Sequence, residues 1–456
     1  MDDASRHPAG ALALAAARTT WTALPAPVRA QAADLIVDTF AVMARGLTHR
    51  DYAPFVQACL HGNGRCTVIG QAGSYPPTVA AQVHGGAMTV IQLQDGHRMA
   101  RGHPASHVLP VALAMAEETG ADGAAFLSAF VGAYEACVRI GMALNGLHPD
   151  VHDAGTWSTV GATVAASMLL RLTPEQIADA IEGACALGLL PWSQTAPQGA
   201  TMHHLYVGVA TASGITAAFG AQAGLRGLPG TVERFFGPRA GAAFNPAQVA
   251  AGIGPDGSWA HFEMMNAYLK IHPTCAHLHG VNDAIEALIR DDGVTANEIA
   301  SVDIAISKHA KAYDNPQPAT ELAARFSVGY SAAIAFVRGG LGFDAISPAE
   351  IAKTAVRDLA ERIAVRHDPA LDRHYPAGRP AVVTVVLKDG RRFKREVIDV
   401  RGDHTNPTTR AERRAKATTL LEASLGKEQA GSILSACDAV FAGGPLKLLT
   451  DGLSGR

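Results

Sequence analysis

The hydrophobic positions in the first half of the chain recur with the period of an α-helix. Apolar side chains return every three or four residues between Val28 and Met43, and again between Phe126 and Cys137. The run Thr173-Pro174-Glu175-Gln176 supplies an N-cap residue, a proline in the first turn and a glutamine three residues after the cap, so it predicts a helix start. Few stretches before residue 260 alternate with period two, and this region predicts an all-α domain.

The pattern changes after about residue 295. Residues 301–307 alternate between apolar and polar and predict a strand. Ser347-Pro348-Ala349-Glu350 opens a further helix. The apolar runs Val382–Leu387 and Phe393–Val400 flank Asp389-Gly390, a pair that favours a tight hairpin turn. A domain of mixed α and β structure therefore follows the helical one.

The helical period returns after residue 402, so we expect the last segment to pack back on the first domain. The expected fold is mainly α, with a large all-helical domain and a smaller α+β domain. We expect the helical domain to comprise residues 1–264 and 403–456, and the α+β domain to comprise residues 265–402.

Composition narrows the class of protein. The 456 residues are 48% hydrophobic and 17% charged, with a net charge of -3, which gives no electrostatic reason to expect nucleic acid or a membrane as partner. The six cysteines are scattered without a C-x-x-C pair, which disfavours a zinc ribbon, a redox dithiol or an iron–sulfur cluster. The acidic start at Asp2 lacks the basic region of a secretory signal, so we expect a cytoplasmic protein.

One long segment, from Gly183 to Leu225, contains no Asp, Glu, Lys or Arg. Pro191 and Pro197 interrupt it, and it carries polar residues together with many small ones. A membrane span needs an unbroken apolar stretch, so this segment predicts tightly packed helices and loops inside the protein.

Histidines are clustered in four short stretches, which suggests acid–base chemistry because imidazole titrates near neutral pH. The loop Gln92–Pro110 adds an aspartate and two arginines to three of them, although His103 could instead cap the next helix. His203 and His204 interrupt the charge-free segment, where burial of an ionisable group is costly. A lysine with several histidines precedes a helix at 270–279, a natural site for a carboxylate. No metal site is expected, because a second half of any ligand set is missing.

Several of these segments, taken in order, resemble the 2-methylcitrate dehydratase (MmgE/PrpD) family, which includes cis-aconitate decarboxylase and iminodisuccinate epimerase. The resemblance covers nearly the whole chain and rests on these motifs: DLIVDTFAVMARG, QLQDGHRMARGHPASHVLPVALAMAE, HDAGTWSTVGATVAASMLLRLTPEQIADAI, GATMHHLYVGVATASGITAAF, YLKIHPTCAHLHGVNDA and FSVGYSAAIAF.

The resemblance implies a helical domain joined to a lid domain, an active site between them, a homodimer, and catalysis without metal or organic cofactor. By position it implies catalytic roles for a set of five residues: Asp95, His103, His152, Lys270 and Tyr330. The surrounding segments supply the residues expected to bind substrate: Gln92, Gln94, His97, Arg98, His203, His204, His272 and His279.

The chain departs from the family pattern at several positions. Gln92 and Gln94 stand where acidic residues usually lie, and an amide takes up no proton at neutral pH. His203 stands where lysine or arginine is common, and Ala276 replaces a frequent arginine. The chain therefore resembles the family in its overall motifs, whereas its substrate or its reaction could differ from those of other members.

Three hypotheses follow. The first is a cofactor-independent lyase, a dehydratase or decarboxylase, acting on a small di- or tricarboxylate by α-proton abstraction or carboxylate loss. The second is an epimerase or isomerase of a carboxylic acid, which the two glutamines favour because fewer proton donors face a leaving hydroxyl. The third is a binding homologue that has lost catalysis.

Overall fold

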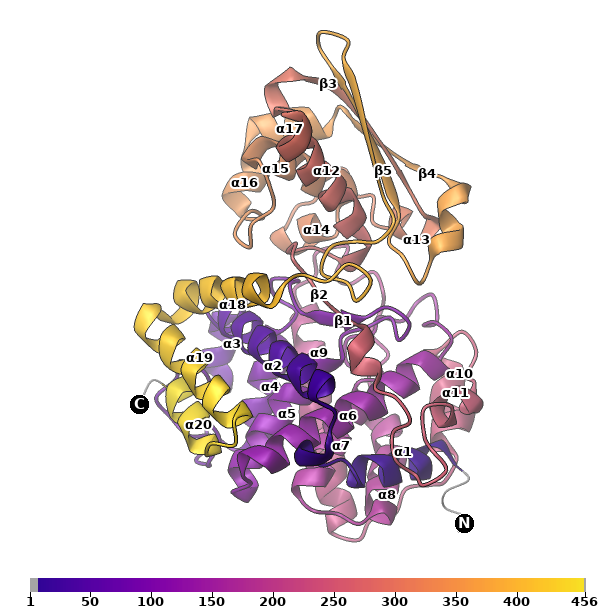
Figure 1. Cartoon of the computed structure of the whole chain (residues 1–456), viewed down its shortest axis with the longest axis vertical. Helices are drawn as coiled ribbons and strands as arrows, with labels where there is room; N and C mark the ends of the chain where they lie inside the picture. Colours follow the sequence, from indigo (N-terminus) through magenta and orange to yellow (C-terminus); the bar gives the residue numbers. More distant parts are fainter. Residues whose placement is uncertain (1–6, 455–456) are drawn as a thin grey trace.

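The computed structural model describes residues 7–454 and has the mainly α fold expected from the sequence (Figure 1). A large helical domain carries a smaller α+β domain at one end, and the chain crosses between them near residues 265–275 and 400–408. The buried apolar residues form two clusters: one lies in the helical domain and one, from Cys275 to Leu387 with Ala196 added, in the smaller domain. We call the smaller domain the lid.

The helical domain is built from helices of the first 250 residues. They have these bounds: α1 Pro8–Ala17, α2 Ala26–Leu47, α3 Ala53–Cys59, α4 Pro77–Ala87, α5 Pro104–Thr119, α6 Gly123–Ala143, α7 Thr159–Leu169, α8 Pro174–Leu187, α9 His203–Gln222, α10 Gly237–Ala240 and α11 Pro246–Ala250. The expected capping box opens α8, because the Thr173 side chain accepts from Gln176 N while the Gln176 side chain accepts from Thr173 N.

Three C-terminal helices pack on this domain. They are α18 Arg410–Leu425, α19 Lys427–Phe441 and α20 Leu446–Ser454. Helix α18 packs along α2, where Arg413 lies 2.8 Å from Asp34 and Lys416 lies 2.7 Å from the buried Asp38.

The charge-free segment comprises the end of α8, the loop 188–202 and α9. Helix α9 packs against α4 and α7. A Cβ at Gly214 of α9 would lie 2.6 Å from the Ala162 side chain of α7, so only glycine permits this close approach. The small residues of the segment therefore serve helix packing.

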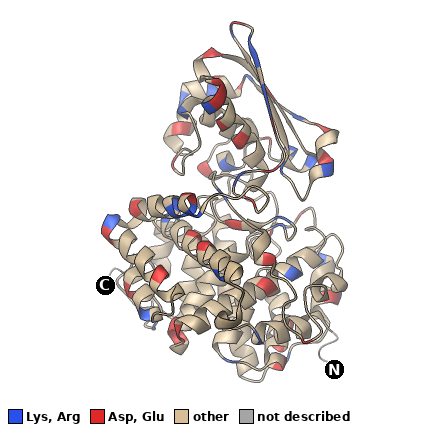
Figure 2. Cartoon of the chain, in the orientation of Figure 1, with Lys and Arg blue, Asp and Glu red and all other residues tan. Residues whose placement is uncertain are grey.

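Among residues 7–454, one helix, α6, is long and apolar enough to cross a bilayer. In this structure 83% of its most apolar window is buried, against α5 and α7 among others. It occupies the place of a core helix. Figure 2 shows charged residues gathered on α18 and on the lid hairpin and sparse across the other helices of the large domain.

The lid contains a four-stranded sheet in the order β4-β3-β5-β6. Strand β3 runs parallel to β4 and antiparallel to β5, and β5 pairs with β6 as the expected hairpin. The strands and the lid helices have these bounds: β3 Ile299–Ile306, β4 Ile363–His367, β5 Ala381–Leu387, β6 Arg392–Val397, α12 His279–Asp292, α13 Lys308–Lys311, α14 Glu321–Arg325, α15 Val328–Arg338, α16 Pro348–Ala352 and α17 Thr354–Ala360.

A two-stranded ribbon lies where the domains meet (Figure 1). Strand β1, Asp95–His97, pairs antiparallel with β2, Ala267–Leu269. The first strand interrupts the region that the sequence predicted to be all α. Three residues with one glycine carry no detectable period, so pairing with a distant segment, rather than local pattern, makes this strand.

Candidate active site

The ribbon of β1 and β2 brings Asp95, one of the predicted catalytic residues, close to Lys270. Asp95 pairs in register with Leu269, the residue before Lys270. The Lys416 ammonium on α18 donates to the carbonyl of Leu93 at 3.1 Å and to that of Lys270 at 2.8 Å. Helix α18 thereby anchors the backbone just before β1, at Leu93, and just after β2, at Lys270.

His103 occupies the N-cap position of α5, but its side chain does not cap the helix. Its Nδ1 faces the carbonyl oxygen of Asp95 at 2.5 Å and must therefore donate to it. The Nε2 lone pair is then the basic site of the ring. Burial lowers the pKa of His103 to about 4, against the opposing effect of the Asp153 carboxylate, so the ring is neutral at neutral pH.

His152 and His203 lie edge to face, with ring centroids 4.8 Å apart. His152 Nδ1 accepts from the backbone N–H of Ala154 at 3.1 Å, which leaves Nε2 as the ring nitrogen that can donate a hydrogen bond. His203 is buried, and neither of its ring nitrogens has a hydrogen-bond partner among the described residues. Burial holds the pKa of His203 well below its usual value, and the nearby histidines and the Lys270 ammonium act in the same direction.

Lys270 is 1% exposed, and no carboxylate lies within ion-pair distance of its ammonium in residues 7–454. Its polar neighbour is the Gln92 amide oxygen at 3.5 Å. Gln92 adopts a left-handed backbone conformation with φ 52° and donates its amide hydrogen to Thr89 O at 2.8 Å, which fixes the oxygen toward the lysine. Burial lowers the pKa of Lys270 to about 8. An amide at this position leaves the lysine charge unneutralised.

Two further polar side chains of the loop are buried with unused atoms. Gln94 is 1% exposed, and neither its amide nitrogen nor its amide oxygen has a partner among the described residues. Asp95 accepts from Ala105 N at 3.2 Å with one oxygen, while the other is unpartnered. Burial raises the pKa of Asp95 to about 7, so this carboxyl group can hold a proton near neutral pH.

Asp153 belongs to the same group, and the sequence analysis did not single it out. It is buried, one of its carboxylate oxygens lies 3.2 Å from His152 Nδ1, and the other has no hydrogen-bond partner in the described chain. Its charge opposes the lowering of the pKa of both His103 and Lys270. The available signal was a carboxylate placed directly between His152 and a long uncharged helix.

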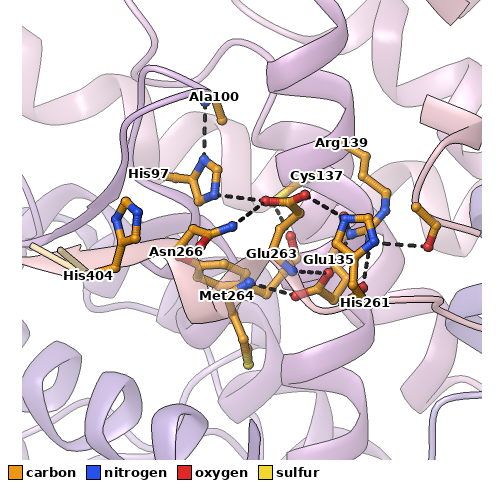
Figure 3. A network of polar contacts seen from close by, with 12 residues as sticks. His97, Ala100, Glu135, Cys137, Arg139, His261, Glu263, Met264, Asn266 and His404 are labelled. Atoms are coloured by element: carbon orange, nitrogen blue, oxygen red, sulfur yellow. Dashed lines mark hydrogen bonds and ion pairs between the residues drawn. The ribbon is translucent and has the colours of Figure 1, made fainter. Parts of the chain in front are cut away.

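His97 and Arg98, both predicted to bind substrate, have protein partners instead. His97 Nε2 lies 3.4 Å from Glu263, and its Nδ1 accepts from Ala100 N at 3.2 Å (Figure 3). Arg98 is buried and forms an ion pair with Asp403 in the segment that leaves the lid. Both side chains stabilise the loop and the domain junction.

Four other predicted residues lie around the group with their own contacts. His204 Nδ1 lies 3.2 Å from the Thr89 hydroxyl, and His272 Nε2 lies 2.8 Å from Asp283. His279 packs on His272 with ring centroids 5.2 Å apart. Tyr330 donates its hydroxyl to Ile351 O at 2.5 Å inside the lid, and no contact joins it to the histidines. The structure therefore gathers His103, His152, His203 and Lys270, and it leaves Tyr330 apart.

One set of possible metal ligands occurs in residues 7–454, away from this group. His49, Asp51 and Glu321 have ligand atoms within 4.8 Å of one another. Glu321 already pairs with Arg50 at 3.1 Å and with Arg325 at 2.6 Å, and these guanidinium groups compete with any cation. We interpret the set as an ion-pair network that ties the helical domain to the lid.

The structure thus places buried imidazoles of the helical domain and a buried lysine, which has no ion pair in the described chain, close to the junction with the α+β domain. The chain matches the MmgE/PrpD N-terminal domain over residues 10–242 and the MmgE/PrpD C-terminal domain over residues 272–439. It belongs to the MmgE/PrpD family, which confirms the resemblance seen in the motifs.

Curated relatives cover most of the chain at low identity. The chain is similar to a cis-aconitate decarboxylase of Aspergillus terreus, with 26% identity over 80% of both chains. It is also similar to a cis-aconitate decarboxylase-like protein of Aspergillus oryzae, with 24% identity over 89% of both chains. The cis-aconitate decarboxylase of Homo sapiens is 27% identical over 79% of this chain and 76% of its own length.

Proposed function

We propose that the chain is a cofactor-independent lyase that removes a carboxylate as CO2 from a small di- or tricarboxylic acid. The observation that carries this proposal is the buried Lys270 ammonium, which no described carboxylate neutralises. A buried charge without a counter-ion is costly, so a site that keeps one gains most when a bound anion supplies the partner.

Binding uses the groups that lack partners. Lys270 pairs with one substrate carboxylate, and the N–H groups of His152 and His203 donate to the oxygens around the reacting carbon. The pKa of His203 lies well below its usual value, so this imidazole hydrogen-bonds the substrate without neutralising it. Gln92 keeps the ammonium aimed at the substrate by accepting from it at 3.5 Å.

The reaction breaks the C–C bond to one carboxylate, and CO2 leaves. The electron pair passes into the adjoining unsaturated or carboxylate system, where Lys270 stabilises it. Lys270 then gives a proton to the carbon that receives the pair, since a pKa of about 8 makes it a stronger acid than an exposed lysine. Solvent restores that proton.

Decarboxylation agrees with the groups present better than dehydration does. Loss of a hydroxyl needs a general acid beside the leaving oxygen; the amides of Gln92 and Gln94 cannot act as acids, so Asp95 or Lys270 would have to supply that proton, whereas loss of CO2 needs no acid at the leaving group. The pKa of His103 is about 4, so its ring is deprotonated at neutral pH and has no acidic proton to give. The names of the curated relatives favour the same reaction.

The test is incubation of the purified protein in D2O with a panel of di- and tricarboxylates, followed by NMR and by CO2 release. We expect CO2 and a product carrying one new deuterium at the protonated carbon. Water loss to an alkene would support a dehydratase, and exchange without net change would support an epimerase. Binding with no turnover or exchange across the panel would reject catalysis altogether.

We also propose that two copies of the chain form a homodimer through an apolar surface on the helical domain. Seven of the ten exposed large apolar side chains fall between Leu187 and Phe235, among them Trp192 at 61% and Leu228 at 74% exposure. Isolated exposed apolar residues are normal, whereas a contiguous apolar patch is typical of an interface, and we propose that this segment supplies one. The Leu228→Glu variant should elute as a monomer in size-exclusion chromatography with light scattering; an unchanged mass relative to the wild type would refute this face.

A further inference from the structure

Two arginines and two further histidines lie around the ring of Tyr375. The guanidinium of Arg101 lies 5.1 Å from the ring centroid, and that of Arg379 lies 5.2 Å from it. His309 stacks on the same ring at 3.8 Å, and His277 lies 5.8 Å away with nearly parallel planes. We call Arg101, His277, His309, Tyr375 and Arg379 the Tyr375 cluster.

The cluster spans the two domains next to the proposed active site. Arg101 belongs to the helical domain and precedes His103 by two residues, whereas the other four members belong to the lid. Arg101, His277 and Tyr375 are half-buried and His309 is exposed, so solvent reaches the cluster. Arg101 adopts a left-handed backbone conformation with φ 56°, which turns the loop between β1 and α5 at this point.

The positive charges of this cluster lack carboxylate partners. In residues 7–454 no ion pair includes Arg101, Arg379, His277 or His309. Arg379 is 6% exposed and donates to the carbonyls of Pro376 and Gly378 at 2.7 and 3.0 Å, but its Nε is unpartnered. The Nε of Arg101 is buried without a partner as well.

Contact with an aromatic ring does not replace a counter-ion. A cation over a tyrosine face gains a modest attraction and leaves the charge in place. The charges also act on one another: burial and the neighbouring Arg379, His309, Arg101 and Lys270 hold the pKa of His277 well below its usual value. Since Lys270 contributes to this effect, the cluster and the proposed active site share one region of positive potential.

We propose that the Tyr375 cluster is a second anion subsite, in which Arg101 and Arg379 bind a substrate carboxylate distant from the one held by Lys270. This inference rests on the proposed function and extends it, because it selects acids with at least two carboxylates spaced across the domain junction. A planar guanidinium forms two parallel hydrogen bonds to a carboxylate, so Arg101 supplies orientation as well as charge.

The experiment compares Arg101→Gln with Arg373→Gln. Arg373 is an exposed arginine in the lid segment that carries Tyr375 and Arg379, and it has no ion pair in the described chain. Its removal therefore controls for the loss of one positive charge. Binding of tricarballylate, a non-reacting tricarboxylate, is measured by isothermal titration calorimetry on the whole chain. We expect its affinity to fall at least about tenfold in Arg101→Gln and less than about twofold in Arg373→Gln.

Turnover supplies the second readout. On whichever acid the wild type converts, Arg101→Gln should raise KM about tenfold and change kcat less than about threefold, because the distal carboxylate takes no part in bond breaking. Equal affinities in the two variants would overturn the subsite, even with an active enzyme. Arginine-dependent binding without turnover of any acid would support the subsite while rejecting the proposed reaction. Tighter binding of inorganic phosphate than of tricarballylate would overturn the carboxylate assignment.

Discussion

Two polar clusters flank the ribbon of β1 and β2, and they differ in how their charges are satisfied. In the first, which we call the Glu135 network, Glu135 accepts from the backbone of Glu263 and Met264 at 2.8 Å and pairs with Arg139 (Figure 3). In the second, around Lys270, the ammonium has the Gln92 amide oxygen at 3.5 Å and no ion pair, and the His203 ring and the Gln94 amide lack hydrogen-bond partners among the described residues.

The Glu135 network is closed upon itself. Burial opposes ionisation of Glu263, but hydrogen bonds from His97, Asn266 and His261 outweigh it and lower its pKa to about 2. Arg139 also donates to His261 O at 2.8 Å. In this network each of the two glutamates is paired with a cationic or hydrogen-bonding side chain, which stabilises the fold, whereas the Lys270 side keeps an ammonium without a carboxylate partner in the described chain. Histidine content alone does not distinguish the Glu135 network from the group around Lys270. The two differ in whether the charged side chains have oppositely charged partners.

The largest effect is expected from Lys270→Met, which keeps the length of the side chain and removes its charge. We expect kcat/KM to fall about 10^3-fold, the scale of a lost electrostatic contact in a water-poor site. The melting temperature should stay equal or rise, because the variant no longer buries an unpaired ammonium. A turnover within about tenfold of the wild type, measured on a folded variant, would remove the basis of the proposed mechanism.

The matched change in the other cluster is Glu135→Gln. It leaves the Arg139 guanidinium buried without its carboxylate, and we expect a loss of about 3–5 kcal/mol in unfolding free energy by urea titration. The kcat of the folded fraction should change less than about twofold. A stable variant with lost turnover would mean that the Glu135 network takes part in catalysis, and the contrast between the clusters would be wrong.

Local signals predicted most of the fold. The apolar stripe of α2, the capping box of α8 and the Asp389-Gly390 turn between β5 and β6 depend on residues near one another in the chain. Strand β4 was not predicted, because it is short and two of its five residues are the polar pair Arg366 and His367. Local periodicity carries too little information for such an element.

The site was predictable as a set of segments but not as a set of contacts. Repeated histidines marked His103, His152 and His203, and the structure brings them together with Lys270. The ion pair of Arg98 with Asp403 depends on how two distant segments are placed. The contact of Asp153 with His152 depends on how two adjacent side chains are oriented. Residue type gives the chemical capacity of a side chain, and only tertiary packing decides whether that capacity is already used.

A smaller effect should follow from Gln92→Glu, which places a carboxylate 3.5 Å or so from the ammonium, where the amide oxygen now lies. The new charge would pair with Lys270, raise its pKa by about one unit or more, and compete with substrate. We expect kcat/KM to fall about tenfold at neutral pH.

The pH profile checks the cause of that loss. In the wild type Lys270 is protonated below its pKa of about 8, so kcat/KM should fall as pH rises through that value. In Gln92→Glu the alkaline limb should move upward because the ion pair retains the proton. Gln57→Glu, an exposed control, should leave the limb in place. An unshifted limb in Gln92→Glu would show that the limb belongs to a group other than Lys270.

The smallest effect is expected from Tyr330→Phe, which tests the one predicted catalytic residue that the structure leaves outside the group. Its hydroxyl donates to Ile351 O and has no contact with the histidines, so kcat should stay within about twofold of the wild type. Loss of this hydrogen bond should cost about 1 kcal/mol of stability in urea titration. If turnover instead fell about 100-fold with stability unchanged, the lid would have to rearrange during catalysis to bring Tyr330 to the substrate, and the division into satisfied and unsatisfied clusters would hold only for the unliganded state.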